Sequence, residues 1–159
     1  MHLSVDPGVS VVIPIFNGAP LVNLLIEEVE EYLRRTGEPY EILLIDDGSR
    51  DNSWQTIQSV ASTNRLVKGL KLSRNFGQQI AVTAGISRAH RNYVIVLDGD
   101  LQNPPSAIPR ILEALKTGSD IVYTTSKIRN NAKDEITSRA FRFILSSVFK
   151  VDIVKHQLM

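Results

Sequence analysis

Short apolar runs alternate along the chain with longer stretches in which apolar residues recur at helical spacing. The short runs predict strands at about 9–15, 41–45, 67–73, 93–97 and 120–124. The longer stretches predict helices at about 21–33, 52–63, 78–89, 108–116 and 133–149, with Asp51 or Asn52 as the cap of the second. The pattern therefore predicts a series of β–α units.

Strands separated by helices favour right-handed crossovers, so the predicted fold class is α/β, a doubly wound and mostly parallel sheet with helices on both faces. The sequence has no internal repeat and no low-complexity linker, and 159 residues with 43% hydrophobic content are enough for one core. We expect a single domain over residues 1–159, with ligands at the carboxyl ends of the strands.

Composition narrows the function classes. The 18 Lys and Arg nearly balance the 17 Asp and Glu, so a nucleic-acid partner is not expected. With no cysteine, the chain offers no disulfide framework, no thiol nucleophile and no Cys-ligated metal. No apolar run approaches the roughly 20 residues of a membrane-spanning helix, which predicts a cytoplasmic protein.

Acidic residues gather where two of the predicted strands end. Asp46 and Asp47 follow the second strand, and Asp98 and Asp100 follow the fourth. An Asp-Gly pair is also a common turn former, and this alternative stays open for the first pair. The second pair is harder to explain in this way, because it supplies two carboxylates, with the amide of Gln102 beside them. Such oxygen ligands suit Mg²⁺ or Mn²⁺ bound together with a diphosphate.

Other phosphate-binding motifs are missing. The chain has neither a P-loop nor a Gly-x-Gly-x-x-Gly turn after its first strand. The aspartyl-phosphate phosphatases carry their Asp-x-Asp on the first strand, not on the fourth. Sugar nucleotidylyltransferases carry a Gly-rich basic loop after the first strand, which residues 15–20 do not supply.

Four segments in this order resemble the inverting family-2 glycosyltransferases, and most closely the polyprenyl-phosphate branch that includes dolichyl-phosphate mannose synthase. They are VVIPIFN at 11–17, IDDGSRD at 45–51, RNFGQQ at 74–79 and DGDLQNPP at 98–105. The resemblance extends from about Val9 to Val154. It implies a GT-A fold and the transfer of a hexose from a nucleotide-diphosphate sugar to a polyprenyl phosphate, a step of cell-envelope glycan synthesis.

The resemblance also implies roles for particular residues. The donor site would be formed by Pro14, Phe16, Leu44, Asp46, Asp98, Gly99 and Asp100. The divalent cation, Mg²⁺ or Mn²⁺, would be held by Asp98, Asp100 and Gln102, and the two aspartates would serve catalysis through it. UDP is favoured over GDP, because the similarity is to the bacterial branch. Gly18 stands where the family usually has Glu, which removes one contact near the base.

The C-terminal part carries the expected acceptor side. Lys127 and Arg129 are the candidates for binding the acceptor phosphate, although Ser126 stands where the family usually has Arg. From Lys127 onward there are 7 Lys and Arg against 3 Asp and Glu, and the predicted helix at 133–149 has a broad apolar face. This helix suits an anionic membrane surface at the cytoplasmic face, or packing against protein.

Family members continue well beyond the position of Met159, so we expect a chain that is incomplete after its donor-binding half. Its acceptor half would then be a missing C-terminal region or another subunit. Two other functions stay open: a non-catalytic module that binds nucleotide sugars or serves assembly, and a sugar nucleotidylyltransferase.

Overall fold

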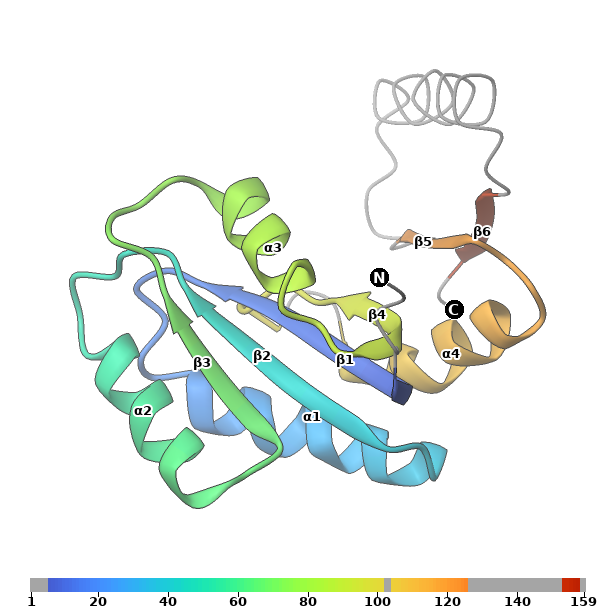
Figure 1. Ribbon diagram of the computed structural model, residues 1–159, viewed down its shortest axis with the longest axis horizontal. Coiled ribbons are helices and arrows are strands. Elements are labelled where there is room, and N and C mark those ends of the chain that lie inside the picture. Colours follow the sequence, from blue (N-terminus) through green and yellow to red (C-terminus); the bar gives the residue numbers. More distant parts are fainter. Residues whose placement is uncertain (1–5, 102–103, 126–152, 158–159) are drawn as a thin grey trace. The chain divides into compact units, whose positions relative to one another are not determined.

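The computed structural model describes residues 6–101, 104–125 and 153–157 (Figure 1). The chain divides into two compact units, residues 1–108 and 109–159, which are described separately. The predicted helix at 133–149 lies outside the described residues, as do Gln102, Ser126, Lys127 and Arg129.

The first unit is built on a parallel four-stranded sheet. Its strands are β1 (Asp6–Ile15), β2 (Tyr40–Asp46), β3 (Val67–Lys71) and β4 (Arg91–Val96). Their order across the sheet is β3-β2-β1-β4, and every neighbouring pair is parallel. The chain thus moves outward from β1 to β3 and then returns to place β4 on the other side of β1. The carboxyl ends of β1 and β4 form a topological switch point, where open α/β sheets bind ligands.

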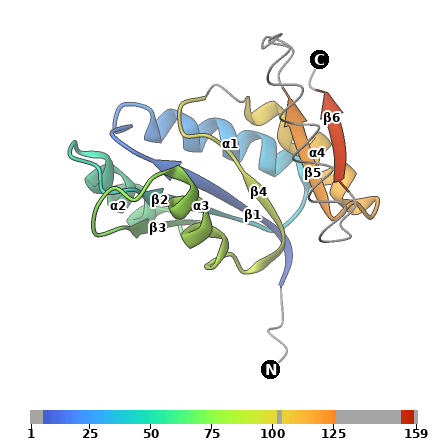
Figure 2. The same ribbon diagram turned by 90° about the horizontal axis from the view of Figure 1, so that it is seen from above.

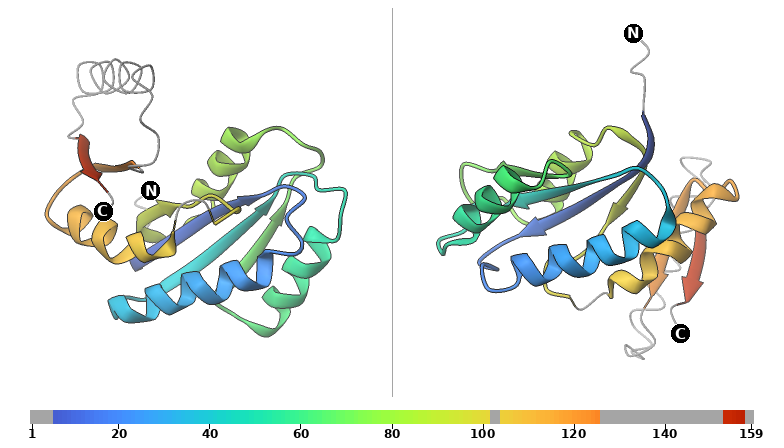
Figure 3. Two further views of the ribbon diagram at one scale, coloured as in Figure 1. Left: turned by 180° about the vertical axis from the view of Figure 1, so that it is seen from behind. Right: turned by 90° about the horizontal axis from the view of Figure 1, so that it is seen from below.

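Helices cover both faces of this sheet, as the alternation of elements predicts. The helices α1 (Val22–Thr36) and α2 (Ser53–Thr63) lie on one face, and α3 (Gln78–Ile86) lies on the other (Figure 2). The view from below has α1 and α2 in front of the strands (Figure 3). Right-handed crossovers explain the division, since α3 connects strands in the opposite direction across the sheet.

The core lies between the sheet and these helices. The two central strands are nearly continuous buried runs, and all seven residues of β2 are buried. On the α3 face, Val12 of β1 and Ile45 of β2 pack with Ala81 of α3. Buried runs of this kind are typical of parallel strands covered on both faces.

The predicted cap of α2 is only partly correct. Asn52 occupies the N-cap position, but its side chain makes no cap hydrogen bond. Asp51 instead accepts hydrogen bonds from the backbone N–H and the hydroxyl of Ser53. The bond from the Ser53 hydroxyl is the main reason why the pKa of Asp51 lies below its ordinary value.

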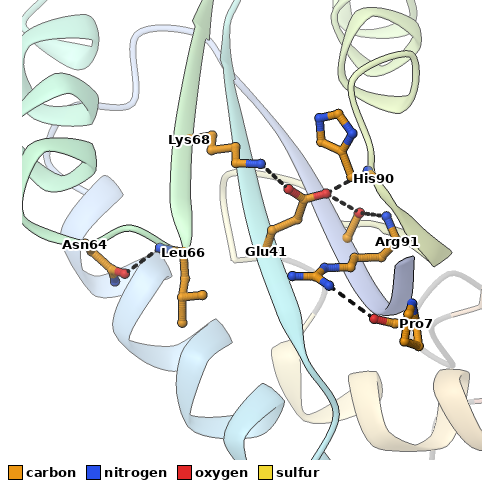
Figure 4. Close-up of polar contacts among 8 residues, drawn as sticks. Pro7, Glu41, Asn64, Leu66, Lys68, His90 and Arg91 are labelled. Carbon is orange, nitrogen blue, oxygen red and sulfur yellow. Dashed lines mark hydrogen bonds and ion pairs between the residues drawn. The ribbon is translucent and has the colours of Figure 1, made fainter. Parts of the chain in front are cut away.

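A polar cluster lies at the amino end of the sheet, which is the end opposite the switch point. Glu41 of β2 is only 3% exposed, and its carboxylate accepts hydrogen bonds from Ser10 Oγ, Lys68 Nζ and the His90 N–H at 2.7, 2.7 and 2.8 Å (Figure 4). Burial raises the pKa of Glu41, but these hydrogen bonds and the Lys68 charge together hold it below its ordinary value. The cluster joins three strands to the turn between α3 and β4.

The second unit contains a separate small sheet. The short 3-10 helix η1 (Pro105–Ala107) ends the first unit and is followed by the helix α4 (Ile108–Lys116). In the second unit, β5 (Ile121–Thr125) pairs in parallel with β6 (Ile153–Gln157). The strand predicted at 120–124 is thus present, but it lies outside the four-stranded sheet. The strand β6 has no counterpart among the predictions, because Ile153 and Val154 form too short an apolar run.

Candidate active site

A cavity of about 630 Å³ opens at the switch point of the first unit. The loops that follow the four strands all contribute to its wall. The lining residues are Pro14, Ile15, Phe16, Asn17, Gly18, Leu21, Asp47, Asn75, Gly77, Gln78, Asp98, Gly99 and Asp100. The cavity therefore lies where the topology and the ends of the strands predict a ligand site.

The loop after β1 is bonded to the loop after β2. Three successive backbone N–H groups, of residues 17–19, donate to side-chain oxygens. The acceptors are Ser49 Oγ, Ser53 Oγ and Asp51 Oδ2, at 2.9, 2.9 and 3.1 Å. In a P-loop or a dinucleotide-binding turn, backbone N–H groups of this kind bind phosphate. Here they are already used by the protein, so a phosphate in this cavity needs another partner.

Asp47 holds the loop between β3 and α3. It is buried, its Oδ1 accepts from the Phe76 N–H at 2.8 Å, and its Oδ2 accepts from the Gly77 N–H at 2.9 Å. The next residue, Gly48, has a φ of +68°, and a Cβ there would lie 2.3 Å from the carbonyl carbon of Arg74. The Asp47-Gly48 pair is therefore a device that fixes residues 74–77 beside the cavity.

Asp46 differs from its neighbour. It is the last residue of β2 and is fully buried, and its Oδ1 accepts from the Ser49 N–H at 3.2 Å. Its Oδ2 is buried and has no hydrogen-bond partner among the described residues. A buried carboxylate oxygen without a donor is costly and rare in native proteins. The carboxyl edge of the sheet thus holds one unused acceptor, although Asp46 itself, unlike Asp47, does not line the cavity.

The two aspartates after β4 both line the cavity. Asp98 Oδ1 accepts a hydrogen bond from Gln78 Nε2 at 2.6 Å. A Cβ at Gly99 would lie 2.7 Å from the Pro14 carbonyl oxygen, so glycine lets this loop approach the end of β1. Within the described part of the chain no group of three or more His, Cys, Asp or Glu could hold a metal ion. The pair needs ligands from elsewhere to complete a cation site.

The other predicted donor residues fall into two groups. Pro14 and Phe16 line the cavity, and Phe16 is 48% exposed. Leu44 is fully buried in β2 and does not line the cavity, because a central strand is covered on both faces. Asn75 and Gln78 also line the cavity but are not among the predicted site residues, although the third resembling segment at 74–79 contains both.

The sheet order and the helices on both faces are those of an open, doubly wound α/β fold, and alignment with solved glycosyltransferases identifies it as the GT-A fold. A mannosyltransferase from Pyrobaculum calidifontis, in complex with GDP-Man and Mn²⁺, aligns with a TM-score of 0.64 at 20% identity, over 80% of this chain and 38% of that one. Glucosyl-3-phosphoglycerate synthase from Mycobacterium tuberculosis, in complex with Mn²⁺, UDP and phosphoglyceric acid, aligns with a TM-score of 0.61 at 22% identity, over 89% and 49%.

The chain belongs to glycosyl transferase family 2, whose model matches residues 10–155. An undecaprenyl-phosphate 4-deoxy-4-formamido-L-arabinose transferase from Pectobacterium atrosepticum is 42% identical over 81% of this chain and 39% of its own length. An uncharacterised glycosyltransferase from Bacillus subtilis is 35% identical over 91% of this chain and 45% of its own length. The predicted family and fold are thereby confirmed. The chain spans about two fifths of the length of the curated relatives that it matches.

The described helices include none that is long and apolar enough to cross a membrane.

Proposed function

We propose that this chain forms the donor-binding part of an enzyme that transfers a sugar from a nucleotide-diphosphate sugar to a polyprenyl phosphate. The observation that carries the proposal is the cavity at the switch point, with Asp98 and Asp100 in its wall. Several relatives are undecaprenyl-phosphate 4-deoxy-4-formamido-L-arabinose transferases, and their names supply the acceptor class. A lipid acceptor of this kind favours sugar transfer at the cytoplasmic face of a membrane.

The donor set fits a hard divalent cation. Two carboxylates from one loop face a cavity whose backbone N–H groups at 17–19 are already bonded, so a diphosphate needs a positive partner there. Mg²⁺ and Mn²⁺ take oxygen ligands, and Mg²⁺ commonly combines one or two carboxylates with water and phosphate oxygens. Asp98 and Asp100, with Gln102 next to them in sequence, would hold the ion. When bound, it would neutralise the charge on the departing nucleoside diphosphate.

The base would lie at the β1 and β2 side of the cavity. Asp46 is fully buried and does not itself line the cavity, but it directly precedes the cavity residue Asp47, and its unpartnered Oδ2 would accept a hydrogen bond from a ring N–H of a base that reaches it. Pro14 and Phe16 offer apolar surface in the cavity wall. Uracil and guanine both present such an N–H. The preference for UDP therefore rests on the similarity to the bacterial transferases.

We infer an inverting displacement. The bond between the anomeric carbon and the diphosphate oxygen breaks, while a phosphate oxygen of the acceptor forms the new bond on the opposite face of the sugar. A phosphate oxygen is already ionised near neutral pH, so the chain needs no general base to activate it. Lys127 and Arg129 stay the candidates for holding the acceptor phosphate.

The same geometry weakens the nucleotidylyltransferase alternative. That reaction needs a loop after the first strand that binds the triphosphate, and the N–H groups of residues 17–19 already donate to side-chain oxygens. A non-catalytic module that binds nucleotide sugars would use the same cavity, and transfer assays distinguish it from an enzyme.

Calorimetric titration of the chain with UDP, with and without Mn²⁺, tests the proposal. We expect Mn²⁺-dependent binding that weakens at least about tenfold in Asp100→Ala, since loss of one of two carboxylate ligands removes much of the cation affinity. The matched control is Asp6→Ala, at the exposed amino end of β1, which should bind as the native chain does. Binding without metal that survives Asp100→Ala would refute the proposed role of the pair.

A further inference from the structure

One side-chain contact in the cavity wall joins the start of α3 to the loop after β4. Gln78 Nε2 donates to Asp98 Oδ1 at 2.6 Å, and both residues line the cavity. Only the amide nitrogen of Gln78 can serve as this donor, because an ionised carboxylate accepts hydrogen bonds and does not donate them. The first residue of α3 is thus bonded to the first carboxylate after β4.

Gln78 is itself held in place through its backbone. The buried carboxylate of Asp47 accepts hydrogen bonds from the N–H groups of Phe76 and Gly77, the two residues that precede Gln78. The carbonyl of Gly77 then accepts from the N–H groups of Ile80 and Ala81 in the first turn of α3. The backbone on both sides of Gln78 is therefore hydrogen-bonded, and its side chain extends from this bonded segment.

We propose that Gln78 is a positioning residue for the cation site, acting through Asp98. Its hydrogen bond to Oδ1 restricts the rotation of the Asp98 carboxylate, so that the group is already oriented when a divalent cation binds. This inference rests on the proposed function, in which Asp98 is a ligand. A neutral amide suits the task, because it donates a hydrogen bond without placing a second positive charge beside the cation.

The expected effect follows from what outer hydrogen bonds do in metal sites. Partners that orient a ligand typically change metal affinity by about 10- to 100-fold. Gln78 is solvent-exposed and neutral, so we expect an effect at or below the lower end of this range, a loss of about threefold to tenfold. The loss should vanish where Asp98 can no longer act as a carboxylate ligand.

The chain provides a matched control in the next residue. Gln79 has the same side chain, is also exposed and lies in the same helical turn, but it does not line the cavity. Replacement of either glutamine by methionine keeps length and helix propensity while it removes the amide. A difference between Gln78→Met and Gln79→Met therefore reports the position and not the substitution.

The experiment measures Mn²⁺ affinity in the presence of UDP by electron paramagnetic resonance, for the native chain, Gln78→Met, Gln79→Met, Asp98→Asn and the double variant Gln78→Met/Asp98→Asn. We expect weaker binding in Gln78→Met, native binding in Gln79→Met, and no additional loss when Gln78→Met is added to Asp98→Asn. Equal melting temperatures of the two glutamine variants show that folding is not the cause.

A metal-free measurement tests the contact itself. In NMR spectra of the chain without metal, Asp98→Asn should shift the side-chain amide resonances of Gln78 and leave those of Gln79 in place. No shift, or native Mn²⁺ affinity in Gln78→Met while Asp98→Asn loses binding, would overturn the positioning role alone. Failure of the proposed function is distinct: the native chain would not bind Mn²⁺ with UDP, and the inference would fall with it.

Discussion

Two buried acidic residues occupy opposite ends of β2, and their surroundings differ. Glu41, at the amino end, has hydrogen-bond donors on both carboxylate oxygens, from a serine, a lysine and a backbone N–H. Asp46, at the carboxyl end, has one oxygen bonded to the Ser49 N–H and one with no partner among the described residues. A carboxylate that the fold itself satisfies serves structure, whereas one with a buried unused acceptor is suited to a ligand.

Substitution of Glu41 should have the largest effect on stability. Glu41→Ala should lower the free energy of unfolding by about 2–3 kcal/mol, because it leaves the buried Ser10 hydroxyl and the His90 N–H without their acceptor. Urea denaturation measures the loss. The control is Glu27→Ala, on the exposed face of α1, which should change stability by less than about 0.5 kcal/mol. A Glu41→Ala chain as stable as the control would show that Glu41 does not stabilise the fold.

A substitution at Asp46 should weaken ligand binding and leave stability nearly unchanged, in contrast to Glu41→Ala. Asp46→Asn keeps an oxygen for the Ser49 N–H but replaces the other oxygen with an amide, which cannot accept from a base. We expect the affinity for UDP to fall about tenfold, which corresponds to about 1.4 kcal/mol, with little change in the free energy of unfolding. Calorimetry and urea denaturation on the same variant separate the two effects. Native affinity in a folded Asp46→Asn chain would contradict the role of Asp46 in binding.

The pKa of Glu41 gives a dependence on pH with a definite sign. Its pKa is lower in the folded chain than in the unfolded chain. Its contribution to the free energy of unfolding is therefore fully present at pH values above the pKa of the unfolded chain. That contribution is lost as the pH falls through the folded pKa, below the ordinary glutamate value of about 4.3. Unfolding measured between about pH 6 and 3 should therefore show a stability advantage of the native chain over Glu41→Gln that shrinks toward acid. An advantage that is constant over this range would be contrary to the lowered pKa.

The smallest effect is expected at Lys68, which shares the cluster but is about half exposed. Its ammonium lies 2.7 Å from Glu41 Oε2, with 49% of the lysine side chain accessible to solvent. In Lys68→Met, Glu41 Oε1 keeps its bonds from Ser10 and His90, whereas Oε2 loses its donor. Because the lysine side is half-exposed, water can take the place of the ammonium, so we expect the contribution of an exposed ion pair, about 0–1 kcal/mol. Thermal denaturation in low and high salt should show a loss below about 1 kcal/mol that decreases with added salt. A loss as large as that of Glu41→Ala would mean that the lysine, and not the pair of neutral donors, holds the cluster.

Much of the fold follows from periodicity. The apolar runs at 9–15 and 41–45 lie within β1 and β2, and the helix predicted at 108–116 coincides with α4. The end of α3 does not follow, since the pattern predicts a helix to residue 89 and the structure ends it at Ile86. Periodicity reports which residues can face a core, but it does not say where the backbone turns away.

The site is predictable in part, for a related reason. The rule that ligands lie at the carboxyl ends of strands identifies Asp98 and Asp100, and the family resemblance adds Pro14; all three line the cavity. The different tasks of Asp46 and Asp47 are not readable from the sequence, because they depend on which carboxylate reaches the N–H groups of a loop about 30 residues away. The contact between Gln78 and Asp98 likewise arises only from tertiary structure.

The proposed function requires that the carboxyl ends of β1 and β4 bind a nucleoside diphosphate together with a divalent cation. Paramagnetic broadening tests it most directly, by titration of Mn²⁺ and UDP into isotope-labelled chain. The amide signals of Gly18 and Gly99, at the cavity, should broaden first, while that of Gly8, at the amino end of β1, should stay sharp. Broadening centred on the amino end of the sheet, or none at saturating UDP, would contradict it.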